Sequence, residues 1–184
     1  MKVKQIMALA AELCGRRDVA DYLDKGLTAD AAASEREEQT LLRCYNLAEN
    51  EIALDYLPLK KRETFASDGF IAFSAFAEPP LEIFAVRGAR GEKLPFSQTE
   101  EGIRVRAGNA EVTYSYRPAV KEADDEPSIS GKAGERVLAL GTACEYALMS
   151  GLLDAAQLLD VRYRDALACA CRERGGRMKM RRWA

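Results

Sequence analysis

The sequence predicts an α+β fold, namely a helical bundle built from both ends of the chain with an antiparallel β unit inserted between them. Apolar residues recur every three or four positions in segments 1–60 and 135–176, which is the spacing of amphipathic helices. Within 61–117 they alternate every second residue instead, as in strands. Because these strands form one block and do not alternate with helices, a parallel sheet of βαβ units is not expected.

The N-terminal part of the bundle is expected to hold three helices, of which the third is the longest. Ser34 and Glu37 have the spacing of a capping box and predict the start of this helix. Pro58 cannot continue a helix, so the helix is expected to end near Tyr56. Its buried stripe is predicted to comprise Leu41, Tyr45, Ala48, Ile52 and Tyr56.

The inserted segment is predicted to form five or six antiparallel strands. Its clearest signal is a hairpin over 103–116, in which apolar and polar residues alternate around a two-residue Gly108-Asn109 turn. That turn would fix the register and pair Val105 with Val112. The residues expected to face inward are Ile103, Val105, Val112, Tyr114 and Tyr116.

Residues 118–134 are predicted to form a flexible acidic loop between the β unit and the last helices. Prolines, glycines and the acidic cluster 122–126 cannot build a packed element. A solvated connector is the simpler interpretation, and an acidic binding loop stays open as the alternative.

Segment 135–176 is predicted to contribute two further helices to the bundle. Leu159 in the second of them is expected to share a core with Ile52. Glu145 lies in an otherwise apolar stretch, and we expect it to form a structural ion pair with Arg162 or Arg164.

Composition excludes much catalytic chemistry. None of the 184 residues is histidine, so neither a Ser-His-Asp triad nor an imidazole metal ligand is possible. The five cysteines contain no C-x-x-C pair, and Cys14, Cys44 and Cys144 are interpreted as small buried apolar residues, with a cysteine-only metal site as the alternative. We therefore expect no enzyme, no catalytic residues, no metal and no cofactor.

The net charge and the length of the apolar runs bear on the cellular location of the protein and on its binding to nucleic acid. It carries 27 Lys and Arg against 29 Asp and Glu, and this net charge of −2 argues against a generally basic nucleic-acid binder. The longest strongly apolar run, Phe70–Ala77, is too short to cross a bilayer, and no long apolar signal segment follows Met1. A soluble, intracellular protein without membrane contact or specific nucleic-acid binding is expected.

A basic tail, residues 177–184, follows Gly175-Gly176. Within 172–184 there are six basic residues and one acidic residue. A basic segment with a tryptophan anchor suits docking on a partner, and a frayed solvated terminus is the alternative interpretation. The expected partner-binding residues are Arg177, Lys179, Arg181, Arg182 and Trp183.

Several stretches together resemble a known class of virion protein. The long helix Leu41–Pro58 runs straight into the β segment, Val112–Pro118 ends that segment, and helices with Ala143–Ala147 and Tyr163–Ala166 precede the basic Arg-Trp ending. This order is similar to phage and prophage head–tail adaptor (connector, neck) proteins, in particular the podophage tail-tubular type with β-structure inserted into a helical bundle.

The resemblance implies a non-enzymatic structural assembly protein of a phage or prophage head–tail junction. Such adaptors form homo-oligomeric rings that contact a portal-type or tail protein, and their terminal arms reach onto neighbours. The implied location is the cytoplasm during assembly and then the head–tail junction of the virion. The alternative function is a small-ligand or nucleic-acid binding module of a bacterial cytoplasmic protein.

Overall fold

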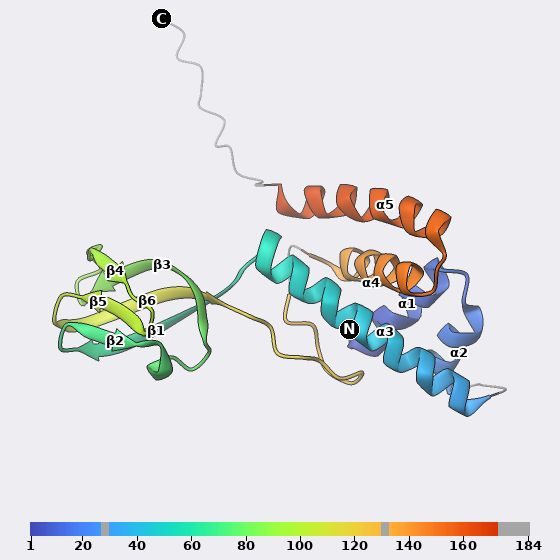
Figure 1. Cartoon of the computed structure of the whole chain (residues 1–184), viewed down its shortest axis with the longest axis horizontal. Coiled ribbons are helices and arrows are strands. Elements are labelled where there is room, and N and C mark those ends of the chain that lie inside the picture. The colour runs from blue at the N-terminus through green and yellow to red at the C-terminus, as the bar shows by residue number, and fades with distance from the viewer. Residues whose placement is uncertain (27–29, 130–132, 173–184) are drawn as a thin grey trace, which may run out of the picture.

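Both ends of the chain build one helical bundle, and the segment between them builds a separate β unit (Figure 1). The computed structural model describes residues 1–26, 30–129 and 133–172. This arrangement confirms the α+β fold class. The helices are α1 (Val3–Leu13), α2 (Arg17–Lys25), α3 (Ala31–Glu51), α4 (Glu135–Met149) and α5 (Leu153–Cys171).

The bundle buries its core around α4, which packs against α1, α3 and α5. Ile52 and Leu159, from opposite ends of the sequence, are both buried in this core, as predicted. A polar network joins α3, α4 and the turn before α2. The Tyr146 hydroxyl donates to Glu37 Oε2 at 2.7 Å, and Arg16 Nη1 donates to the Tyr146 oxygen at 3.0 Å. Burial and the bond to Glu37 raise the pKa of Tyr146 to about 12, so it stays a neutral donor.

The start of α3 differs from the prediction, whereas the helical backbone ends at Tyr56, as predicted. The helix begins at Ala31, because the side chain of Asp30 accepts a hydrogen bond from the Ala33 backbone N–H and caps it before Ser34 is reached. After Glu51 the backbone continues as a π-helical turn, Ile52–Tyr56. This wider turn shifts the following residues around the axis, and Tyr56 is 45% exposed, whereas the other four residues of the predicted stripe are buried.

Six strands form the β unit as two small antiparallel sheets of order β1-β6-β3 and β2-β5-β4. The two sheets share one core, which is distinct from that of the bundle. Ile103, Val105, Val112 and Tyr114 are buried in it as predicted, and Tyr116 packs against it half-buried. The strands are β1 (Leu59–Ser67), β2 (Phe70–Ala72), β3 (Pro80–Gly88), β4 (Phe96–Gln98), β5 (Gly102–Val105) and β6 (Gly108–Tyr116).

The predicted hairpin over 103–116 is wrong in its pairing. β5 pairs with β2 and β4, and β6 pairs with β1 and β3, so Val112 lies opposite Glu63 and Val86 rather than Val105. Gly108 is the first residue of β6 and has a φ of 130°, which glycine adopts without strain. The chain therefore changes sheets here, and the inward-facing residues keep their face while exchanging partners.

The described part of the acidic loop, residues 118–129, is bonded to the bundle, which corrects the solvated connector. Backbone N–H groups of Val3 and Lys4 donate to carbonyls at Asp125 and Ala123, at 2.9 and 2.8 Å. These bonds satisfy donors at the start of α1 that no intrahelical carbonyl can reach. Ile129 is buried in the bundle core, so the loop covers the side of the bundle that α1 and α3 present to it.

Candidate functional site

A groove of about 380 Å³ lies on the bundle where α3, α4 and α5 meet. We call it the α3/α5 groove. The π-helical turn begins just beyond the residue that α3 contributes. Its lining residues are Glu51 from α3, then Gly141, Cys144, Glu145 and Leu148 from α4, and Leu153, Ala156, Gln157, Asp160, Tyr163 and Arg164 from α5.

Gly141 allows the three helices to approach closely at one end of the groove. A Cβ on this residue would lie 3.0 Å from Tyr163 Cε2 and 3.1 Å from the Cβ of Ala48. At the same place the Tyr163 hydroxyl donates to Glu51 Oε2 at 3.1 Å and joins α5 to α3. Burial, with the Glu51 charge, raises the pKa of Tyr163 well above its ordinary value, which keeps it a donor.

Glu145 gives the groove its unusual electrostatics. Burial raises the pKa of its carboxyl, and the negative charge of Glu51 raises it further. The predicted ion pair with Arg162 or Arg164 is wrong. Arg164 Nε instead donates to Asp160 Oδ1 at 2.9 Å, because these residues lie four apart on the same helix. Across residues 1–26, 30–129 and 133–172, no ion pair or hydrogen bond reaches the Glu145 carboxylate.

Large apolar side chains surround these carboxylates and face solvent. Leu148 is 49% exposed and Leu153 is 62% exposed, although both line the groove. Met149, next to Leu148, is 52% exposed, and its sulfur accepts from the Cys44 thiol at 3.5 Å. Apolar groups that gather around an indentation are typical of surfaces that another molecule covers. The groove thus offers apolar area and carboxylates to a ligand that carries both an apolar group and a cation.

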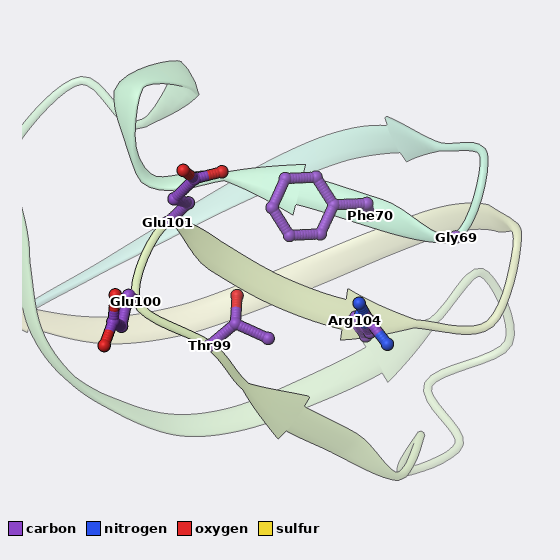
Figure 2. A pocket seen from close by; sticks show the side chains of 6 residues that line it. All are labelled: Gly69, Phe70, Thr99, Glu100, Glu101 and Arg104. Atoms are coloured by element: carbon purple, nitrogen blue, oxygen red, sulfur yellow. The ribbon is translucent and has the colours of Figure 1, made fainter.

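A second hollow, of about 600 Å³, lies on the β unit (Figure 2). The Phe70 ring from β2 lies over Gly102, where a Cβ would approach Phe70 Cζ to 2.7 Å. Arg104 on β5 lies beside it, and Glu101 precedes β5. The hollow is open and brings an aromatic face, a guanidinium and carboxylates to one surface.

Sequence patterns did not indicate the α3/α5 groove, because it needs three helices whose relative rotation no single helix specifies. The signal that could have found it is Gly141, a glycine within a strongly apolar helix. The predicted partner-binding residues, Arg177, Lys179, Arg181, Arg182 and Trp183, lie outside the described residues.

Comparison with models of known protein families gives no match, and comparison with curated proteins gives none either. In the described ranges, no group of three or more cysteine, aspartate or glutamate side chains is arranged to hold a metal ion. Every helix that the structure describes is too short or too polar to cross a bilayer. The geometry of the bundle and the β unit is therefore the basis of the functional argument.

Proposed function

We propose that this protein is a non-enzymatic structural assembly protein of a phage or prophage head–tail junction, a subunit of the adaptor or connector ring. The observation that carries the proposal is the insertion of the β unit between α3 and α4 of one bundle. The resemblance to tail-tubular adaptors implies this arrangement. The partners are further copies of the chain and a portal-type or tail protein. Assembly takes place in the cytoplasm, and the ring then lies at the head–tail junction.

The surface of the bundle supports an assembly role. A subunit of a closed ring contacts its two neighbours through two different faces. The exposed leucines of the α3/α5 groove provide one apolar face. The β unit has its own core, so it can contact a partner without disturbing the packing of the bundle.

Co-expression with the portal-type protein of the same structural-gene block tests this function. We expect the two proteins to co-purify and electron microscopy to show rings. Leu153→Glu should weaken this assembly, because it places a charge on the groove. Val120→Glu is the matched control, since Val120 is 79% exposed on the loop and lies outside the groove. A chain that stays monomeric with portal-type and tail proteins present contradicts the proposal, as does a gene neighbourhood without structural genes.

The hollow beside Phe70 supports the alternative, a small-ligand or nucleic-acid binding module. An exposed ring next to Arg104 is a surface on which a base can stack. Glu100 and Glu101 line the same hollow and would repel a phosphate backbone, which is why we rank this function second. A fluorescently labelled single-stranded DNA oligonucleotide tests it. Binding at physiological salt that Phe70→Ala abolishes would favour the alternative over an adaptor.

A further inference from the structure

The described residues leave the α3/α5 groove open to solvent, and its lining has a defined chemical requirement. Glu145 and Glu51 both carry carboxylates on its surface, and Arg164 is already occupied by Asp160. Bringing apolar surface over two such carboxylates is unfavourable unless cations accompany it. A suitable occupant therefore combines an apolar anchor with adjacent positive charges.

Residues 177–183 of the sequence have this combination. Residues 177–183 hold four basic residues and Trp183, which is the single tryptophan of the sequence. Arginine suits a carboxylate partner because its guanidinium forms bidentate hydrogen bonds. Trp183 directly follows Arg181 and Arg182, so one short segment can place an indole and two guanidinium groups together.

We propose that the α3/α5 groove receives Arg181, Arg182 and Trp183 of a second copy of this chain. The two arginines pair with Glu51 and Glu145, and the indole lies against Leu148 and Leu153. The choice of a second copy rests on the proposed function, since a ring requires each subunit to contact the next.

The dimensions of the segment and the groove agree with this proposal. Arg172 is the last residue described at the end of α5, and the eleven residues from there to Trp183 span at most about 36 Å. This reach exceeds the rise of α5 itself, which is about 28 Å for its nineteen residues. The groove's volume of about 380 Å³ lies within the range of sites that enclose a small ligand.

The single tryptophan gives a direct test on the full-length protein. Selective excitation of Trp183 should show a blue-shifted emission and protection from acrylamide quenching as the protein concentration rises. Neighbours in a ring experience an effective concentration of about 1 mM, so the transition should be complete by then. A shift that does not depend on concentration would mean that the segment docks on its own chain. That result, or no shift up to about 1 mM, overturns the proposal.

Charge-reversal variants locate the docking site. Glu145→Arg should raise the concentration at the midpoint of the transition about tenfold, because the guanidinium groups then meet a like charge. Glu12→Arg is the matched control, since Glu12 is exposed on α1 outside the groove. Combining Glu145→Arg with the reversal of one arginine, Arg181→Glu or Arg182→Glu, should restore the transition, because the other arginine keeps Glu51 as its partner. If Glu145→Arg leaves it unchanged, the groove is not the site, and if Glu145→Arg fails to fold, Arg181→Glu with Arg182→Glu alone must raise the midpoint.

The docking of Trp183 and the adaptor function can be refuted independently of each other. Rings that form with the portal-type protein, but without a concentration-dependent Trp183 transition, refute the docking and leave the adaptor function standing. A transition that Glu145→Arg suppresses, in a protein that binds neither portal-type nor tail proteins, refutes the adaptor and leaves self-association through the groove.

Discussion

Two half-buried carboxylates, Glu63 of the β unit and Glu145 of the bundle, have opposite surroundings. In the β unit, Glu63 accepts a hydrogen bond from the Tyr114 hydroxyl at 2.6 Å and another from the Ala77 N–H at 3.1 Å, and Lys61 lies 3.4 Å away. In the bundle, Glu145 has no such partner among the described residues. The carboxylate of Glu63 therefore has its partners within the β unit, whereas the described residues supply none for the carboxylate of Glu145.

This difference shows in the direction of the two pKa shifts. Burial would raise the pKa of Glu63, but the hydrogen bonds from Tyr114 and Ala77 outweigh it and the pKa lies below its ordinary value. Burial and Glu51 raise the pKa of Glu145. Folding therefore favours the charged form of Glu63 and the neutral form of Glu145. An isolated fold gains from the first arrangement and loses from the second, so the second suits a surface that awaits a partner.

The largest expected effect comes from unfolding the β unit while the bundle stays folded. Val112→Asp places an unpaired carboxylate in the core of the β unit, where Val112 is fully buried, and should cost several kcal/mol. Because the two cores share no residue, hydrogen exchange should show loss of protection in the strands and retained protection in α1 and α4. Asn109→Asp, exposed on the same strand, is the control. Simultaneous loss of protection in both regions would show that they fold as one unit.

The second prediction disturbs the bundle alone. Gly141→Leu inserts a side chain where even a Cβ would lie 3.0 Å from the Tyr163 ring. We expect a loss of about 1–3 kcal/mol from overpacking, although leucine is the better helix former. Chemical denaturation followed by helical circular dichroism measures this change. Gly141→Ala adds only the Cβ and is the milder comparison. An unchanged midpoint for Gly141→Leu would mean that the helices are not closely packed at the groove.

Much of the fold could be predicted because the spacing of apolar residues in each helix or strand indicates which of its faces is buried. Alternation placed Ile103, Val105, Val112 and Tyr114 inward, and all four are buried. The same pattern could not name their partners, since a strand with one buried face can pair with any strand that presents a matching face. The Gly108-Asn109 signal for a tight turn was misleading, because a glycine with positive φ also serves a corner between two sheets.

The groove could not be predicted because its properties depend on how three helices are placed together. Glu145 and Arg164 were expected to pair across two helices. Asp160 lies one turn from Arg164 on the same helix, so these two side chains can pair however α4 and α5 are placed relative to each other. The sequence does show the basic segment and Trp183 directly. The structure adds the acidic and apolar α3/α5 groove, to which our proposal assigns that segment.

The third prediction removes one donor from Glu63. Tyr114→Phe should destabilise the β unit by about 1–2 kcal/mol at pH 7, because a hydrogen bond to a charged carboxylate is lost. The folded pKa of Glu63 is depressed, so its stabilising contribution is present above 4.5 and is lost as the pH falls toward the folded pKa. The difference between the two proteins should therefore shrink on acidification. Urea denaturation at pH 7 and at low pH measures the free energy of unfolding of both proteins. A difference between them that stays constant with pH would show that the ionised Glu63 carboxylate does not contribute to it.

The smallest expected effect concerns the carboxylate of the groove. The folded pKa of Glu145 is raised, so its penalty is absent below 4.5, where the carboxyl is protonated in both states, and grows as the pH rises through the folded pKa. Glu145→Gln should thus stabilise the bundle at pH 7 and have no effect at pH 4. Solvent screens this partly exposed group, so the gain stays within about 0.5 kcal/mol.

Thermal unfolding of dilute protein measures this gain, with Glu12→Gln on the exposed face of α1 as the control. Dilution matters, because a second copy that supplies arginine would reverse the sign: a paired Glu145 stabilises the assembly, and its replacement by glutamine then destabilises it. The same substitution should therefore raise the melting temperature in dilute solution and lower it at about 1 mM, where copies meet as in a ring. Destabilisation in dilute solution would instead show that Glu145 has a cation partner within its own chain, and the contrast with Glu63 would disappear.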